Sequence, residues 1–285
     1  MPEQLQLVEC PRDAMQGLHK QVPTDQKVAY LNQLLKVGFH TLDFGSFVSP
    51  KAVPQMADTA EVVEQLDLSS TDTRLLAIVA NQRGAEAAVA FNQIAYLGYP
   101  FSISETFQQR NTRRSISESI PLVKDILALC EKHGKELVLY ISMGLGNPYG
   151  ERWNPEIVEE WAEKMISWGV KIISLADTVG NAQEEDIRLL FRTLLSSHTD
   201  IEWGAHFHAT PSERIMKLTA AWEEGCRRFD SAMLGFGGCP FADDELVGNI
   251  ATESLIPFLE ERGADPNLDR EALQHAMLMA NDIFL

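Results

Sequence analysis

Eight short apolar runs, each followed by a segment with helical spacing, recur along this chain at intervals of roughly 30 residues. The runs are rich in Val, Ile, Leu and Phe, as buried strands are. Strand–helix units repeated in this way form parallel sheets. The predicted strands are residues 5–9, 41–46, 74–80, 99–104, 136–142, 171–177, 202–208 and 229–234.

The number of units favours a closed barrel over an open sheet. Eight units fill 285 residues with no linker, low-complexity stretch or composition break. We therefore predict an α/β fold, a single (β/α)8 TIM barrel over residues 1–285, with an extra C-terminal helical segment at about 269–285. An open doubly wound sheet is the alternative, although "CPRDAM" after the first strand is not a dinucleotide-binding GxGxxG motif.

Local signals support several of the intervening helices. Thr24 is a candidate N-cap, and Asn154 is another, with Pro155 at the first helical position and Gly169 at the far end. The clearest predicted helices are residues 24–37, 115–133, 154–168 and 211–224.

The charge of the chain narrows its partners. A formal net charge of −17 makes nucleic acid an unsuitable partner, whereas an anionic small molecule would need a local basic patch. The dense basic stretch "QQRNTRR" contains Arg110, Arg113 and Arg114, and it is either a solvated loop or such a patch.

The compartment follows from the cysteines and the absence of targeting signals. The four cysteines show no CxxC spacing, which argues against a disulfide scaffold or a zinc knuckle and fits a reducing, cytoplasmic setting. No apolar run has membrane-spanning length, and "MPEQLQLVEC" does not resemble a signal peptide.

Polar side chains at the carboxyl ends of the predicted strands indicate a metal site, because barrel enzymes carry their chemistry there. His206 and His208 stand two apart on a strand and so point the same way. Asp13 follows the first strand and Asn249 follows the eighth, and barrel closure brings these ends together. Two imidazoles with two oxygen ligands predict an open Mg²⁺ or Mn²⁺ site at these four residues.

The motifs around these positions resemble those of the 3-hydroxy-3-methylglutaryl-CoA lyase family of metal-dependent TIM barrels. The matching stretches are "VECPRDAMQ", "FGSFVSPKAVPQMAD", "SETFQQRNTRRSISES", "GLGNPYGE", "SLADTVGN", "GAHFHAT" and "GFGGCPFADDELVGNIATES". The resemblance implies a carbon–carbon lyase that cleaves an acyl-CoA to acetyl-CoA and a keto acid such as acetoacetate.

The resemblance also implies roles for individual residues. Arg12 would stabilise the enolate of the departing thioester, and Cys239 would be the acid–base residue on a flexible loop with Gly237, Gly238 and Pro240. Asp177 and His206 are candidate bases, although Asp177 could simply cap the helix that follows. Further candidates for contacting the substrate or the ligand side chains are Gln16, Asp43, Ser142, Asn147, Thr178 and Glu253.

Alternative roles stay open at three of these positions. Asp43 could serve only to orient Arg12 or a ligand histidine, and Ser142 and Asn147 could merely shape the turn "GLGNPYG".

Three departures from the family pattern keep other functions open. Ala14 replaces a glycine, Asp43 replaces a glutamate and Ala209 replaces an acid. The alternatives are a related barrel aldolase or Claisen condensing enzyme that acts on a 2-keto acid, and a catalytically silent barrel that binds an acyl-CoA. The cysteine loop argues against the aldolases and condensing enzymes, which lack it. The expected partners are an acyl-CoA substrate and a second copy of the chain in a homodimer.

Overall fold

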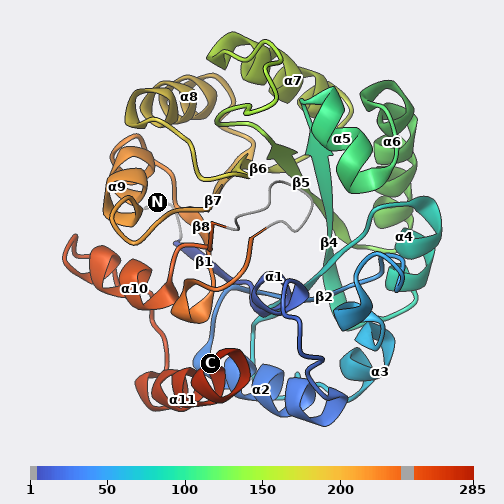
Figure 1. The fold of residues 1–285 in the computed structure, drawn as a ribbon, viewed down its shortest axis with the longest axis vertical. Helices are drawn as coiled ribbons and strands as arrows, with labels where there is room; N and C mark the ends of the chain where they lie inside the picture. Colours follow the sequence, from blue (N-terminus) through green and yellow to red (C-terminus); the bar gives the residue numbers. More distant parts are fainter. Residues whose placement is uncertain (1–4, 239–246) are drawn as a thin grey trace.

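The strands lie side by side and run parallel around a closed barrel, in the order β1 to β8 (Figure 1). The computed structural model describes residues 5–238 and 247–285. Its strands are β1 (Gln6–Glu9), β2 (Thr41–Ser46), β3 (Arg74–Ile78), β4 (Ile94–Ser102), β5 (Glu136–Ser142), β6 (Ile172–Asp177), β7 (Glu202–Phe207) and β8 (Arg228–Ser231). The first strand pairs with the last in register from Gln6 with Arg228 to Glu9 with Ser231. The predicted TIM barrel is therefore confirmed.

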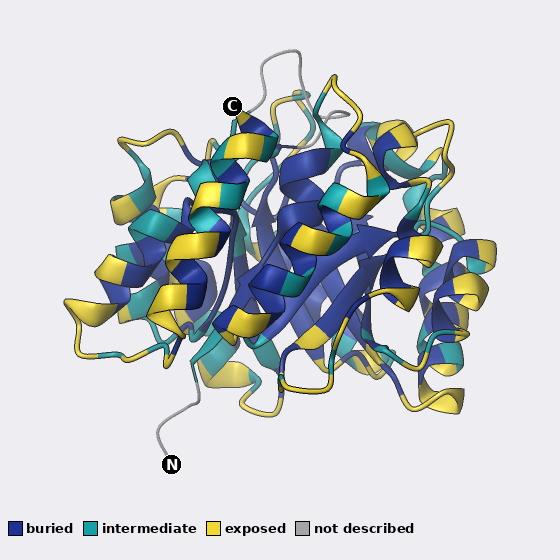
Figure 2. Cartoon of the chain, turned by 90° about the horizontal axis from the view of Figure 1, so that it is seen from below, coloured by how far each residue is buried: buried dark blue, intermediate teal, exposed yellow. Residues whose placement is uncertain are grey.

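Helices surround the barrel (Figure 1), and those in view in Figure 2 turn their buried residues toward the strands. The helices are α1 (Pro11–Gln16), α2 (Thr24–Val37), α3 (Thr59–Glu64), α4 (Gln82–Val89), α5 (Glu105–Thr112), α6 (Ile116–Lys132), α7 (Pro155–Ser167), α8 (Glu184–Ser197), α9 (Arg214–Glu223), α10 (Thr252–Glu260) and α11 (Arg270–Phe284), with 3₁₀ turns η1 (Pro54–Met56) and η2 (Met233–Gly235). The extra C-terminal helix is present as predicted and packs against α2. Within the described ranges, no helix is both long enough and apolar enough to cross a membrane.

One of the two predicted N-caps is confirmed and the other is wrong. Asn154 accepts a hydrogen bond from the Ile157 amide at 3.0 Å and begins α7. Thr24 is already inside α2, and its hydroxyl donates to Asp58 on a neighbouring segment at 2.7 Å. The Thr24 side chain therefore makes a tertiary hydrogen bond instead of the N-cap hydrogen bond that the local sequence predicts.

Two strand boundaries differ from the prediction by three residues or more. β4 begins at Ile94 rather than at residue 99, so Gly98 lies inside the strand. A glycine fits there because a Cβ would stand 2.5 Å from the Ile78 side chain. β8 ends at Ser231 rather than at residue 234. Beyond β8 the Ala232 amide donates to the Ile250 carbonyl at 3.0 Å, and the Met233 amide donates to the Glu9 carboxylate at 2.9 Å, so neither continues the strand ladder.

A buried lysine fastens α9 to the ends of β6 and β7. Lys217 Nζ donates to Asp177 Oδ2 at 2.6 Å, and both side chains are fully buried. The same ammonium donates to the carbonyl oxygens of Gly180 at 2.8 Å and His208 at 3.0 Å. Because the ion pair satisfies backbone groups at two strand ends, it holds the segment that carries His208.

We expect Lys217→Met to lower the free energy of unfolding by about 3–5 kcal/mol, because it leaves the Asp177 carboxylate buried without its partner. Lys171→Met is the matched control, since the Lys171–Asp200 pair is exposed to solvent and its loss should change the free energy of unfolding little. Guanidinium denaturation measures both values. Equal losses in the two variants would contradict this account of the buried pair.

Candidate functional site

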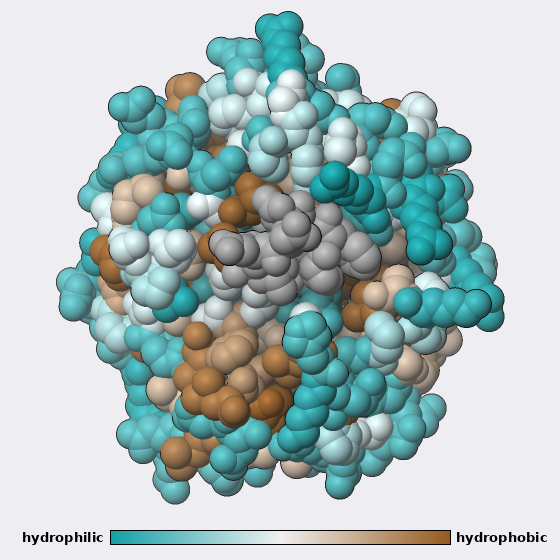
Figure 3. All heavy atoms as spheres, viewed as in Figure 1, coloured by the Kyte–Doolittle hydropathy of each residue, from teal (hydrophilic) through white to brown (hydrophobic). Residues whose placement is uncertain are grey.

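A cavity of about 800 Å³ opens at the carboxyl ends of the strands. Its polar lining comes mainly from residues at or just after these ends, including Arg12, Asp13, Gln16, Ser46, Asn81, Ser142, Thr178, His206 and His208. Figure 3 shows this face of the barrel, where hydrophilic residues predominate and an apolar area lies toward α11. The cavity is therefore in the position where barrel enzymes bind substrates.

Three charged side chains after β1 and within β2 form one buried network. Arg12 Nη1 donates to Asp13 Oδ1 at 2.8 Å, while Arg12 Nε donates to the two Asp43 oxygens at 3.2 and 3.0 Å. Gln16 Nε2 also donates to Asp13 Oδ1, at 2.8 Å. Burial raises the pKa of Asp43 to about 6, although the charge of Arg12 opposes this rise. The network holds the guanidinium in one orientation beside Asp13.

The four predicted ligand residues lie together. Ligand atoms of Asp13, His206 and His208 are all within 4.8 Å of one another. Asn249 Nδ2 donates to Asp13 Oδ2 at 2.6 Å, and the backbones of His208 and Asn249 form an isolated bridge. Residues from opposite ends of the chain therefore meet at one point of the cavity wall.

The ionisation of these groups suits a cation. Burial acts to raise the Asp13 pKa, but Arg12 and the two histidines outweigh it, so this pKa lies well below its usual range. Burial lowers the pKa of His208 to about 4, which leaves its imidazole neutral at pH 7. An ionised carboxylate beside a neutral imidazole is the state in which both bind a metal.

The donor set also fits a divalent ion. His208 Nδ1 is buried and has no hydrogen-bond partner among the described residues. One carboxylate, two imidazoles and one amide provide oxygen and nitrogen donors without a thiolate. These residues could therefore hold a divalent ion and leave positions open toward the cavity.

Two predicted loop glycines touch this cluster directly. Gly237 has φ +118°, and a Cβ there would lie 2.2 Å from Asn249 Nδ2 and 2.8 Å from Asp13 Oδ2. The Gly238 amide faces Asp13 Oδ2 at 3.4 Å. The described geometry thus gives Gly237 a steric reason, namely close approach to the ligand residues. Cys239 and Pro240, which complete the predicted loop motif, lie outside the described residues.

The other predicted residues divide into two groups. Ser142 and Thr178 line the cavity, and the Thr178 hydroxyl accepts a hydrogen bond from the Met143 amide at 2.8 Å. Asn147 is absent from the lining. Its side chain accepts from the Tyr149 amide at 2.9 Å and donates to Glu151 at 2.8 Å, so the structure favours the turn-shaping role for Asn147.

Asp177 and Glu253 also lie outside the cavity lining. Asp177 pairs with Lys217 and accepts from the Asn181 amide at 3.0 Å, so its carboxylate organises the loop after β6. Glu253 accepts from the Leu234 amide at 3.0 Å and supports the left-handed turn there. Asp177 is therefore paired with Lys217 and does not line the cavity.

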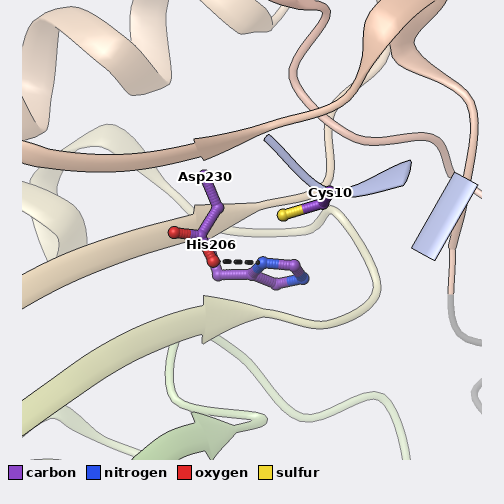
Figure 4. Close-up of side chains that lie close together, drawn as sticks. All are labelled: Cys10, His206 and Asp230. Atoms are coloured by element: carbon purple, nitrogen blue, oxygen red, sulfur yellow. Dashed lines mark hydrogen bonds and ion pairs between the residues drawn. The ribbon is translucent and has the colours of Figure 1, made fainter. Parts of the chain in front are cut away.

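Sequence reasoning missed Asp230, which lies on β8 beneath the histidines. His206 Nδ1 and Asp230 Oδ2 are 2.9 Å apart, and the Cys10 sulfur points toward this pair (Figure 4). Burial acts to lower the His206 pKa, but the hydrogen bond and charge of Asp230 raise it overall. An acid inside the apolar run "FDSAML" was the available signal.

Comparison with known proteins gives consistent results. A family model described as HMGL-like matches residues 4–279. The cytoplasmic 3-hydroxy-3-methylglutaryl-CoA lyase of Rattus norvegicus is 33% identical over 279 residues, which cover 97% of this chain and 80% of the rat protein. The (R)-citramalyl-CoA lyase of Chloroflexus aurantiacus is 32% identical over 273 residues, 93% of this chain and 86% of that protein.

Solved structures share the architecture. An HMG-CoA lyase from Acinetobacter baumannii, in complex with coenzyme A and 3-methylmalate, has a TM-score of 0.91 and 31% identity over 100% of this chain and 92% of its own. The carboxyl transferase domain of Rhizobium etli pyruvate carboxylase has a TM-score of 0.73 at 15% identity, covering 97% of this chain and 46% of its own, and this likeness concerns the fold alone.

We expect Gly237→Ala to weaken Mn²⁺ binding by about tenfold, because its methyl group would push against Asn249 and Asp13 at a typical overpacking cost of about 1–3 kcal/mol. Gly134→Ala is the matched control. Gly134 also has positive φ, at +65°, but a Cβ there meets nothing within 4 Å. Electron paramagnetic resonance of free Mn²⁺ gives both affinities. Equal changes in the two variants would contradict the role assigned to the contacts of Gly237 with Asn249 and Asp13.

Proposed function

The chain belongs to the HMGL-like family and is a carbon–carbon lyase, and on that premise we propose that it cleaves 3-hydroxy-3-methylglutaryl-CoA, or a close 3-hydroxy-3-substituted acyl-CoA, to acetyl-CoA and a keto acid. One observation carries the proposal. The cluster of Asp13, His206 and His208 lies in an 800 Å³ cavity with the Arg12 guanidinium 2.8 Å from Asp13.

We propose Mg²⁺ or Mn²⁺ as the resident ion, held by Asp13, His206, His208 and Asn249. When bound, such an ion lowers the pKa of a substrate hydroxyl and orients it. The protein contributes the arrangement of donors, since Arg12 and Gln16 both hold Asp13 Oδ1.

The proposed reaction is a retro-Claisen cleavage. A base removes the proton of the 3-hydroxyl, the C2–C3 bond breaks, and its electron pair becomes the enolate of the acetyl thioester. Arg12 is the group proposed to stabilise this enolate, because it stays charged and its hydrogen bonds to Asp13 and Asp43 hold it in one orientation at the cavity wall. Of the two candidate bases, Asp177 is engaged by Lys217 and His206 is assigned to the ion, so no base is proposed among the described side chains. Protonation of the enolate carbon completes acetyl-CoA.

Cys239 is the proposed acid for this last step, on the basis of its motif "GGCP" alone. The described cysteines are poor rivals. Cys10, Cys130 and Cys226 are all buried, and burial raises the pKa of both Cys130 and Cys226 to about 12.

The departures from the family pattern bear on the rival functions. Asp43 binds Arg12 through both carboxylate oxygens, so the shorter acid still orients the guanidinium. Ala14 is buried in α1, and the Ala209 amide bonds to the Gly248 carbonyl at 2.9 Å. The Arg12–Asp43 pair supports an active enzyme over a silent acyl-CoA-binding barrel.

A group of cations at the cavity supports an acyl-CoA substrate. The cavity lining includes Lys51, Arg83, Arg113 and Arg114. These positive charges run against a net charge of −17 and suit the phosphates of coenzyme A. Arg110, by contrast, stacks on the Tyr149 ring at 4.7 Å and does not line the cavity.

A cytoplasmic location and a homodimer complete the proposal. The location is supported by the cysteine pattern and by the named cytoplasmic relative. Sedimentation of the purified chain tests the dimer.

The direct test is turnover of an acyl-CoA panel with Mg²⁺, Mn²⁺ or chelator. We expect metal-dependent release of acetyl-CoA from 3-hydroxy-3-methylglutaryl-CoA. Citramalyl-CoA is the second candidate, because a citramalyl-CoA lyase is 32% identical to this chain. Binding of acyl-CoA without turnover of any member would favour the silent barrel. Activity only on free 2-keto acids would favour the aldolases.

We expect Arg114→Ala to raise the KM for the acyl-CoA about fivefold with little change in kcat, because it removes a charge at the cavity and not at the reacting atoms. Arg110→Ala is the control and should leave KM unchanged. Steady-state kinetics at two salt concentrations measures both. A larger rise in KM for Arg110→Ala than for Arg114→Ala would contradict the proposed contact between Arg114 and the coenzyme A phosphates.

We expect Cys239→Ala to lower kcat by about 10² or more, the usual contribution of a general acid, while Mn²⁺ binding is retained. Cys130→Ala should keep its activity, because this thiol is buried in α6 away from the cavity. Alkylation followed by mass spectrometry should modify Cys239 first. Full activity in Cys239→Ala would remove the thiol from the mechanism.

A further inference from the structure

Asp230 forms a buried pair with His206, and the proposed reaction assigns no role to Asp230. Asp230 is 2% exposed and lies on the inner face of β8, and its Oδ2 stands 2.9 Å from His206 Nδ1 on β7 (Figure 4). Its other oxygen, Oδ1, is buried without a hydrogen-bond partner among the described residues. A carboxylate with one oxygen committed to an imidazole is therefore built into the barrel beside the cavity.

We propose that Asp230 is a positioning residue that holds the Nδ1 hydrogen of His206, so that Nε2 is the nitrogen left to face a divalent ion. The inference rests on the proposed metal site. Histidine ligands commonly donate their second ring N–H to a carboxylate, which selects the tautomer and the ring orientation.

The surroundings limit how this imidazole can turn. Its ring meets the edge of Tyr140 at 5.4 Å and that of His208 at 5.1 Å between centroids. On the strand side, Asp230 supplies the hydrogen-bond contact at Nδ1. Arg228, two residues earlier on the same face of β8, brings a buried positive charge near the carboxylate. Asp230 thus sits between a cation and the imidazole, with little freedom to choose another partner.

A second reading makes Cys10, His206 and Asp230 a separate metal site, since their ligand atoms also lie within 4.8 Å of one another. An ion there would compete with the 2.9 Å hydrogen bond between His206 Nδ1 and Asp230 Oδ2 for the same carboxylate. It would also need the thiolate of Cys10, a buried group whose sulfur contacts the Val8 carbonyl at 3.8 Å. The hydrogen-bonded pair explains the same contacts without an added ion.

The experiment compares Asp230→Asn and Asp230→Ala with Cys10→Ala, all in the full chain. Mn²⁺ affinity of the metal-free proteins is measured by electron paramagnetic resonance. We expect a loss of about 10- to 100-fold in Asp230→Ala, the usual effect of removing such a partner, a smaller loss in Asp230→Asn, and less than about threefold in Cys10→Ala. Asp230→Asn keeps the side-chain volume, so it remains informative should the alanine variant fail to fold.

A second readout separates positioning from general stability. Long-range ¹H–¹⁵N spectra of the metal-free protein report the His206 tautomer. We expect Nδ1–H in the wild type and in Cys10→Ala, and its loss in both Asp230 variants.

Four outcomes would overturn the inference. Unchanged Mn²⁺ affinity in the Asp230 variants, or Nε2–H in the wild type, would overturn it while the lyase proposal stands. A Zn²⁺ equivalent lost in Cys10→Ala would establish the separate metal site instead. A wild type that binds no Mn²⁺ would overturn both the proposed metal site and the role of Asp230.

Discussion

Closure of the barrel by hydrogen bonds between β1 and β8 is the constraint on which the site depends. The register from Gln6 with Arg228 to Glu9 with Ser231 brings the segment after β1 beside the segment after β8. Asp13 and Asn249 are 236 positions apart in the sequence, and this pairing brings Asn249 Nδ2 within 2.6 Å of Asp13 Oδ2. Because the strands are parallel, their carboxyl ends all open on one face, and chemistry scattered over the sequence gathers there.

The second feature of the site is the gathering of positive charges at its cavity. The chain carries a net charge of −17, yet the cavity collects Arg12 at its wall and further cations around it. Arg12 is hydrogen-bonded to both Asp13 and Asp43, which hold its guanidinium in one position. The guanidinium still lines the cavity. A buried cation with two carboxylates has little freedom to move, which is the preorganisation that charge stabilisation in a reaction requires.

Two buried carboxylates on adjoining parts of the barrel have different tasks because their partners differ. Asp177 is matched by the Lys217 ammonium, and the pair secures the loop after β6 and the His208 carbonyl. Asp230 is instead matched by the imidazole of His206, a residue of the proposed metal site. An ammonium has three donors and can bind several backbone carbonyls at once. In an imidazole, by contrast, the hydrogen bond made by one ring nitrogen sets the protonation and direction of the other.

The sequence by itself determined the barrel, the paired histidines and the candidate ligand set. Strand and helix periodicities are local properties of the backbone, and residues two apart on a strand must share a face. Only the tertiary structure decided which side chains pair. Lys217 forms an ion pair with Asp177, the Thr24 hydroxyl donates to Asp58, and Asp230 is hydrogen-bonded to His206. The tertiary structure also decided that Gly98 lies inside a strand and that Gly237 is required by its neighbours. In each case the partner is distant along the chain, and the satisfaction of a buried polar group depends on which distant group packing brings within hydrogen-bond distance.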